Sequence, residues 1–186
     1  MDLVETTLET GLVYQGGFLK VHKDRVALPD GSESCREYIR HPGAVAVLAI
    51  TPDRQLVLER QYRYPAGREF VEIPALSKID PHEAPEQTAR RELLEETGYR
   101  AARWVYLGTA HPCIGYSNEK ISYYVAEALT LAERQLDEGE FLEVLTLPIE
   151  RAMEMALTGE ICDSKSIVGL HWLAAYLDGR LPGAAV

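Results

Sequence analysis

The chain has few cysteines and few basic residues for its length. Three cysteines, Cys35, Cys113 and Cys162, are scattered over 186 residues without a CxxC motif. This odd, dispersed set predicts buried free thiols in a reducing cytoplasm, rather than disulfides or a metal or redox site. Lys and Arg number 19 against 29 Asp and Glu, which gives a formal net charge of −10. Such an acidic balance argues against a nucleic-acid partner, which would need a broad basic face.

Long hydrophobic runs are also missing. The longest apolar run, residues 43–50, is too short to cross a bilayer, so no membrane partner is expected. The first ten residues, MDLVETTLET, have neither the basic segment nor the apolar core of a signal peptide, which again favours a cytoplasmic protein. With 186 residues and no internal repeat or long linker, we expect one main domain with a small extension.

The first 42 residues predict a β extension. Residues 12–41 read as strands separated by turns at Lys23-Asp24 and at Pro29-Asp30-Gly31, with a further strand at 33–40. So short a meander has too little core to stand alone. We therefore expect it to pack on the main domain or on a partner chain.

Residues 43–186 predict a mixed α/β domain. The almost continuous apolar run at 44–50 is typical of a strand that is covered on both faces. Further strands are expected at 55–61, 104–108, 121–128 and 140–146, a helix from Pro85, and two closing helices at 148–157 and 164–177. The closing helices carry apolar residues at helical spacing, which we interpret as core positions: Ile149, Ala152, Met153 and Ala156, then Ile167, Leu170, Ala174 and Leu177. Strands on either side of a central helix indicate a mixed α/β fold.

The segment 83–99, EAPEQTARRELLEETGY, predicts a short helix whose exposed end carries three acids, Glu92, Glu95 and Glu96. Residues three and four apart share a helix face, where like charges repel by roughly 0.2–0.5 kcal/mol per pair. Gly98 is expected to end the helix, which puts the last two acids at its negative dipole end. A structural role does not explain such a cluster, whereas Mg²⁺ needs oxygen ligands on one face. The cluster therefore indicates a metal site.

The spacing around these acids resembles the Nudix box, G-x5-E-x7-R-E-U-x-E-E-x-G-U, where U is apolar. Seven residues separate Glu83 from Arg91, Leu93 and Tyr99 are the apolar residues, and every position from Glu83 onward matches. The alternative of a solvated charged helix is disfavoured by the repulsion and the dipole. The box glycine, however, should fall at Ser77. The pyrophosphatase branch usually reads E-[IL]-P-A-G here, whereas residues 72–77 read EIPALS, with Leu76-Ser77 in place of glycine.

The resemblance covers about residues 43–178 and implies a mixed β-sheet sandwiched between helices. The N-terminal strands are similar to those of the ADP-ribose pyrophosphatase branch. The implied activity is hydrolysis of the pyrophosphate bond of ADP-ribose, or of a similar nucleoside diphosphate sugar, to AMP and ribose 5-phosphate. The implied cofactor is Mg²⁺, with Mn²⁺ as a substitute. Close relatives use their N-terminal strands to form a dimer, so a homodimer is expected.

The resemblance also implies roles for individual residues. The metal ligands would be Glu92, Glu95, Glu96, the Ala75 carbonyl and Glu140. The general base would come from the acidic loop 136–140, with Glu140 as first choice and Glu138 as second, so that these two with Glu92 and Glu96 form the catalytic set. Substrate contacts are implied at Arg63, the better match of the pair Arg60 and Arg63, and at Glu72, Tyr116, Ser117 and Asn118. Arg91 would pair with a helix carboxylate.

Several alternatives remain open. The arginines could be ordinary surface charges and the acidic loop a solvated turn. The loop 115–119, GYSNE, which carries Tyr116, Ser117 and Asn118, could be turn chemistry alone. The box does not name the substrate, so a GDP-mannose-type nucleotide sugar is also compatible. From another class, a sensor that binds ADP-ribose without cleaving it is favoured by Leu76-Ser77 alone, because glycine there supplies a backbone conformation or close approach that side chains resist. A purely structural domain conflicts with the acid cluster.

Overall fold

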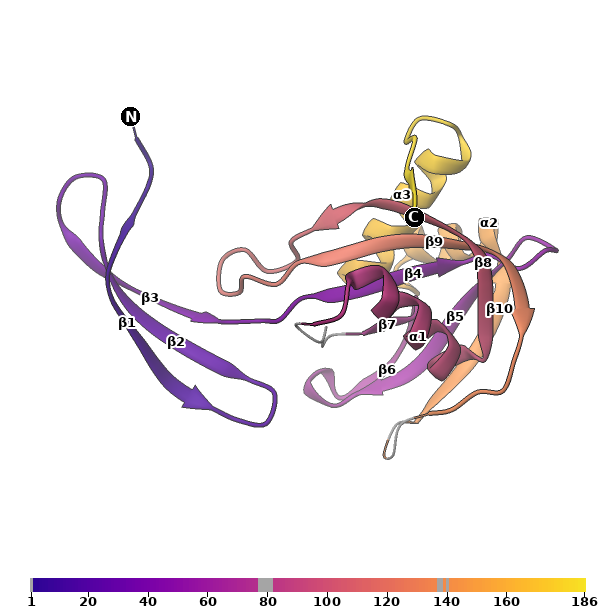
Figure 1. Ribbon diagram of the computed structural model, residues 1–186, viewed down its shortest axis with the longest axis horizontal. Coiled ribbons are helices and arrows are strands. Elements are labelled where there is room, and N and C mark those ends of the chain that lie inside the picture. Colours follow the sequence, from indigo (N-terminus) through magenta and orange to yellow (C-terminus); the bar gives the residue numbers. More distant parts are fainter. Residues whose placement is uncertain (1, 77–81, 137–138, 140) are drawn as a thin grey trace. The chain divides into compact units, whose positions relative to one another are not determined.

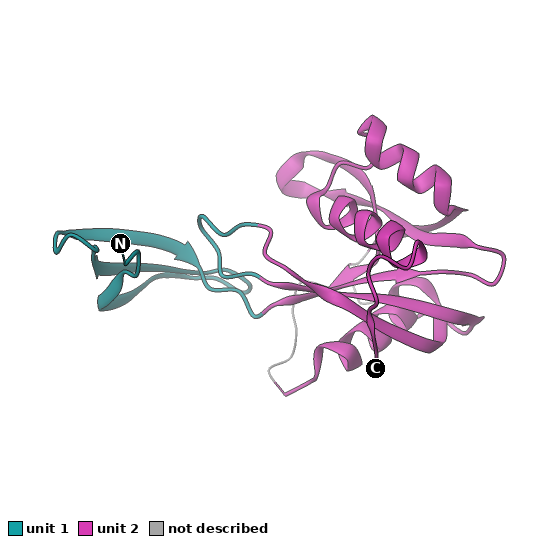
Figure 2. Cartoon of the chain, turned by 90° about the horizontal axis from the view of Figure 1, so that it is seen from above, with its two compact units in different colours: residues 1–42, 113–119 teal, residues 43–112, 120–186 magenta. Residues whose placement is uncertain are grey.

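The computed structural model describes residues 2–76, 82–136, 139 and 141–186 (Figure 1). The contacts divide the chain into two compact units, residues 1–42 with 113–119 and residues 43–112 with 120–186 (Figure 2). One break between the units falls between Pro42 and Gly43, and the division into a β extension (1–42) and a main domain (43–186) stays a prediction. The loop 113–119, which the sequence assigns to the main domain, belongs to the first unit.

The first unit is an antiparallel sheet of β1 (Thr6–Gln15), β2 (Lys20–Ala27) and β3 (Glu33–Ile39), in that order. The predicted turn at Lys23-Asp24 is wrong, because β2 runs through it with pairing to both neighbouring strands. Lys23 forms a salt bridge with Glu37 of β3 at 2.9 Å. A polar residue that suggested a turn thus makes a contact between two strands. The turn at residues 29–31 is confirmed, with Gly31 at a φ of 85°.

The described part of the second unit contains two sheets. The larger has the order β11 (Ala184–Ala185), β8 (Tyr99–Ala110), β9 (Ile121–Leu131), β4 (Ala44–Ala49), β7 (Ala75–Leu76), and only its β4–β9 pair is parallel. The smaller has the order β10 (Leu142–Pro148), β5 (Gln55–Arg63), β6 (Arg68–Glu72), with the short 3₁₀ helix η1 (Tyr64–Ala66) between β5 and β6. The five predicted strands are present as β4, β5, β8, β9 and β10.

Helices cover both faces of the larger sheet. Helix α1 (Pro85–Thr97) packs its buried Ala89 and Leu93 against Val45 and Val47 of β4. On the opposite face, α2 (Ile149–Thr158) and α3 (Ser164–Leu177) pack in a second cluster with the alternate β4 residues, such as Leu48. Because successive strand residues point to opposite faces, β4 supplies both cores and is buried throughout. The prediction of a strand covered on both faces is confirmed.

The helix ends agree with the sequence, but one core stripe does not. Gly98 and Gly159 end α1 and α2 in the left-handed conformation, at φ 74° and 83°. Ile167 and Leu177 of α3, predicted as core, are 41% and 36% exposed. The buried face of α3 is rotated by one residue to Ser166, Gly169, Leu170 and Leu173. The buried face includes the polar Ser166, so the pattern of apolar residues alone does not predict it.

The prediction of buried thiols is also wrong. The three cysteines are free, but Cys35 and Cys162 are exposed and Cys113 is partly buried. Cys162 precedes α3, where its sulfur accepts a hydrogen bond from Arg68 Nη2 at 2.8 Å. In the ranges that the structure describes, no helix is long and apolar enough to span a membrane.

Candidate active site

The acids of α1 are largely buried. Glu92 and Glu96 are 7% and 4% exposed, and Glu95 is partly buried. The expectation that they lie on an exposed helix end is therefore wrong. Glu92 and Glu96 lie beside Leu93, which packs on β4, and this packing shields them from solvent. Burial makes their charges costly unless cations lie close by.

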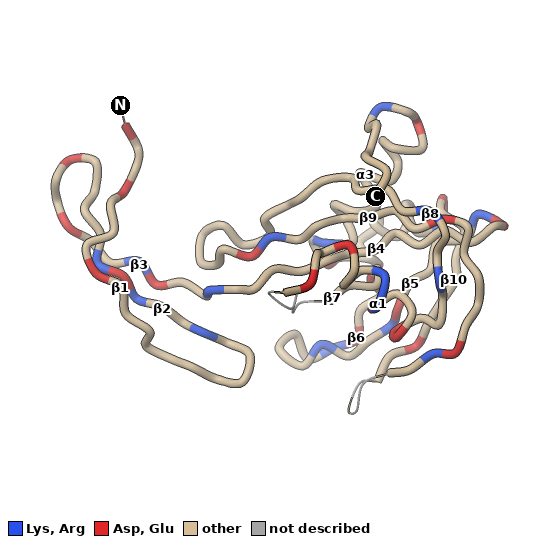
Figure 3. The backbone as a smooth tube through the Cα atoms, in the orientation of Figure 1, with Lys and Arg blue, Asp and Glu red and all other residues tan. Residues whose placement is uncertain are grey.

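Arg91 joins three acids of the box, and Figure 3 shows acidic and basic positions side by side along α1. Its Nη1 donates to Glu95 Oε2 at 2.7 Å and forms a close ion pair with Glu92, while Nη2 lies 3.3 Å from Glu83 Oε2. The predicted pairing of Arg91 with a helix carboxylate is confirmed. Burial alone would lower the pKa of Arg91, but the hydrogen bond to Glu83 and the charges of Glu92 and Glu95 outweigh it and raise this pKa.

A second group of charges comes from β5 and β6. Glu59 and Glu72 are opposite one another in the strand register and are 3% and 2% exposed. Arg63 Nε donates to Glu72 Oε1 at 2.7 Å. Desolvation would lower the pKa of Arg63, but this bond and the charges of Glu72, Glu96 and Glu59 raise it. Arg63 therefore lies in the field of acids from β5, β6 and α1.

Glu59 is a member of this group that sequence reasoning missed. It follows the buried apolar residues Leu56, Val57 and Leu58 on β5 and is itself buried. A charged residue directly after a run of buried apolar residues in a strand is a signal for a functional position, because buried acids are rare without a cation.

Arg60 lies apart from the buried acids of β5, β6 and α1. Successive residues of β5 alternate between the faces of the sheet, so Arg60 points away from the face that carries Glu59 and Arg63. It forms a close ion pair with Glu143 of β10 and lies 3.9 Å from Glu69 of β6. Of the two predicted arginines, the structure brings only Arg63 to the acidic cluster.

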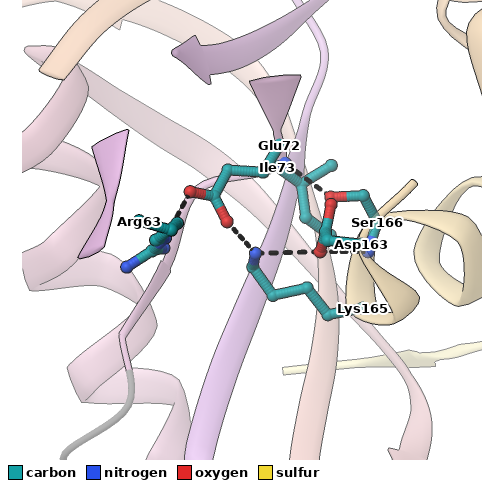
Figure 4. A network of polar contacts seen from close by, with 6 residues as sticks. All are labelled: Arg63, Glu72, Ile73, Asp163, Lys165 and Ser166. Atoms are coloured by element: carbon teal, nitrogen blue, oxygen red, sulfur yellow. Dashed lines mark hydrogen bonds and ion pairs between the residues drawn. The ribbon is translucent and has the colours of Figure 1, made fainter. Parts of the chain in front are cut away.

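Glu72, which the sequence assigns to substrate binding, is enclosed by protein groups. Its Oε1 accepts from Arg63 and its Oε2 from Lys165, which also donates to Asp163 Oδ2 at 2.9 Å (Figure 4). Both carboxylate oxygens of Glu72 are thus held by cationic side chains of the protein. Ala75 of the predicted metal shell is on β7, where it pairs with Ala46 of β4.

Three predicted substrate residues belong to the first unit. Ile39 of β3 donates its N–H to the Tyr116 carbonyl at 2.8 Å, and Asn118 Oδ1 accepts from the His41 N–H at 2.7 Å. Ser117 Oγ accepts from the Glu119 N–H at 3.1 Å, so turn chemistry holds this loop. A pocket of about 390 Å³ lies between Tyr116, Asn118 and the end of β3. Their contact with a substrate stays a prediction, and Ser77, Glu138 and Glu140 lie outside the described residues.

The donor chemistry of α1 fits a hard divalent cation. Glu92, Glu95 and Glu96 offer carboxylate oxygens from one helix, and Glu59 adds a buried carboxylate from β5. Such oxygens are the ligands that Mg²⁺ prefers. Among the described side chains, no three acids, histidines or cysteines already converge as a metal site. Arg91 contacts one oxygen of Glu92 and one of Glu95, so a metal bound there would share these two carboxylates with Arg91.

The family of the chain follows from comparison with known domains. Residues 40–167 match the NUDIX domain, and this range contains the acidic helix, Arg63 and Glu72. The chain belongs to the Nudix family.

Relatives across nearly the whole chain narrow the class. An ADP-ribose pyrophosphatase of Bacillus subtilis (strain 168) is 38% identical over 174 residues, which cover 92% of this chain and 94% of the relative. A methanol dehydrogenase activator of Bacillus methanolicus is 40% identical over 171 residues, with 91% and 92% covered. A GDP-mannose pyrophosphatase of Escherichia coli (strain K12) is 33% identical over 143 residues, with 73% and 75% covered.

The fold is also similar to that of a solved ADP compounds hydrolase. The TM-score is 0.84 over 97% of this chain and 100% of that chain, at 23% sequence identity. The expected Nudix fold is thus confirmed. With the intact acids of the box, these comparisons define the chain as a Nudix pyrophosphohydrolase.

Proposed function

We propose that this protein hydrolyses the diphosphate bond of ADP-ribose to AMP and ribose 5-phosphate with the help of Mg²⁺. The observation that carries the proposal is the group of buried carboxylates on α1 and β5 with Arg63 beside it. Support for the substrate comes from the relative named ADP-ribose pyrophosphatase, which aligns with 92% of the chain.

Each side chain has a distinct task in this proposal. Arg63 is anchored at Nε by Glu72, while its side chain is 42% exposed and can turn its other N–H groups to a phosphate. Glu92, Glu95 and Glu96 would hold Mg²⁺, with Glu59 as a further acid. When bound, Mg²⁺ would neutralise the diphosphate charge and ease the ionisation of the attacking water. Glu140, or else Glu138, would take the proton from that water.

The decisive test is AMP release from ADP-ribose by the purified protein, with and without Mg²⁺, beside GDP-mannose. We expect turnover of ADP-ribose that stops when EDTA is added and returns with excess Mg²⁺. Faster turnover of GDP-mannose would overturn the substrate assignment. Tight ADP-ribose binding without turnover would mean that Leu76-Ser77 has disarmed the site and that the protein is a sensor.

We also propose that the protein is a homodimer formed through its N-terminal sheet. Strand β1 exposes Leu8, Leu12, Val13 and Tyr14, and each is at least 44% accessible in the single chain. In the described residues of the first unit, no helix covers this three-stranded sheet. Exposed apolar side chains on a small sheet favour burial against a partner.

A further inference from the structure

Lys165 is the second residue of α3, and its ammonium group joins two acids from different elements. It forms a close ion pair with Glu72 of β6 and donates to Asp163 Oδ2 at 2.9 Å (Figure 4). Asp163 is the N-cap of α3 and accepts from the Ser166 N–H at 3.1 Å. The contacts thus run from the start of α3 through Glu72 to Arg63.

The position of Lys165 is not explained by the stability of its own helix. A cation in the first turn of a helix lies at the positive end of the dipole, which is unfavourable. A lysine held in one geometry also loses much side-chain freedom, and Lys165 is only 16% exposed. The ion pairs with Glu72 and Asp163 therefore have to offset these costs.

We propose that Lys165 is a positioning residue for Arg63. Glu72 is 2% exposed, and one of its oxygens faces Lys165 while the other holds Arg63 Nε at 2.7 Å. Lys165 holds this carboxylate in one rotation, and so fixes the guanidinium that would meet a substrate phosphate. The inference rests on the proposed function for its effect on turnover, but its effect on Arg63 does not depend on that function.

Removal of the Lys165 ammonium group would leave the carboxylates of Glu72 and Asp163 close together without a cation between them. Lys165 Nζ is the shared partner of Glu72 Oε2 and Asp163 Oδ2, so without it these carboxylates repel. Asp163 is tied to the N-terminus of α3 through its cap bond. Glu72 is therefore the group that turns, and this movement weakens its bond to Arg63.

The test combines kinetics with a direct observation of Arg63. We would prepare Lys165→Met, Lys165→Gln and Lys165→Arg, with Arg151→Met as the control for loss of a cation from a surface ion-pair group on α2. Circular dichroism would identify the variants that fold. If Lys165→Met does not fold, Lys165→Gln replaces it in the measurements. In ¹⁵N-labelled protein, exchange of the Arg63 Nε–H with water should be about tenfold faster without the lysine, since a charge-assisted hydrogen bond is weakened. The Arg variant and the control should retain slow exchange.

Kinetics of ADP-ribose hydrolysis give the second readout. We expect kcat/KM to fall about ten- to hundredfold in Lys165→Met, as for a misplaced binding group, and to recover in Lys165→Arg. In an Arg63→Gln background, Lys165→Met should have little further effect, because both changes act through one guanidinium. Unchanged exchange of Arg63 Nε–H, or equal losses in both backgrounds, would overturn the proposal. If the wild-type protein shows no turnover, the proposed function fails and the exchange measurement alone decides the role of Lys165.

Discussion

Buried charge is the main feature of this molecule at the scale of single residues. Glu59, Glu72, Glu92 and Glu96 are each at most 7% exposed, although acids are almost never buried unless paired. Arg63, Arg91 and Lys165 lie among them and supply positive charge. A site of this composition is held together by charge-assisted bonds, so each acid can be tested by removing its charge while keeping its shape.

The change Glu96→Gln should remove turnover with little loss of fold. It deletes one charge from the proposed metal site, and we expect kcat/KM to fall at least roughly hundredfold, or about 3 kcal/mol of transition-state stabilisation. Glu86→Gln is the control: Glu86 is in the first turn of the same helix and pairs with Arg90, away from the proposed metal ligands. AMP release and thermal unfolding would be measured for both. Mg²⁺-dependent hydrolysis at the wild-type rate in Glu96→Gln would refute the metal assignment.

The two arginines of β5 should differ sharply. Arg63→Gln removes the guanidinium beside the acids, and kcat/KM should fall about ten- to thousandfold, since one charge-assisted contact to phosphate is lost. Arg60→Gln breaks exposed ion pairs with Glu143 and Glu69, so kcat/KM should stay within about threefold and stability within about 1 kcal/mol. Steady-state kinetics and urea unfolding distinguish the two. Similar kinetic losses for both would show that the substrate reaches the opposite face of β5.

The sequence predicts these residues unequally, for a physical reason. Arg91, Glu92 and Glu95 follow from spacing within one helix, where distance along the chain determines distance in space, and Glu83 lies just before that helix. Lys165 lies 93 residues from Glu72 and contacts it only after α3 has packed beside β6. No local pattern carries that information.

At the scale of elements, α3 is fixed to the end of β6 by a buried hydrogen bond. Ser166 Oγ accepts from the Ile73 N–H at 2.9 Å, and both residues are 0% exposed. Ser166→Ala leaves this N–H without its partner, which should lower the free energy of unfolding by about 1–3 kcal/mol. Ser164→Ala, at the exposed first position of α3, is the matched control and should change it by less than about 0.5 kcal/mol. Equal unfolding free energies of the two variants in urea would contradict this account.

Element prediction succeeds where periodicity is long and fails where it is short. The apolar run of β4 and the capped helix α1 are evident from the sequence because burial and capping impose residue types over many positions. Strands β7 and β11 contain two residues each, too few to show alternation. Their pairing depends on β4 and β8 and on tertiary packing.

At the scale of the whole molecule, the charge of −10 must be reconciled with an anionic substrate. The overall field repels a diphosphate, so binding depends on local cations and on added metal. The attraction at Arg63 and the proposed Mg²⁺ would then act mainly at short range, because salt screens charges beyond about 8 Å at physiological ionic strength.

Assembly is the last property to test, because β1 leaves large apolar side chains exposed. If the N-terminal sheet pairs two chains, light scattering during size exclusion should give twice the chain mass of 20.8 kDa. Replacing both Leu12 and Tyr14 by Lys should shift the protein to monomers, since two charges would have to be buried at the interface. Leu157→Lys is the control: this leucine of α2 is 89% exposed in the second unit, and its replacement should leave the dimer intact. A monomeric wild-type protein at micromolar concentration would disprove the dimer, and β1 would then need another partner to cover it. A dimer that survives the β1 changes but not Leu157→Lys would move the interface to α2, where the groove between α2 and α3 is also apolar.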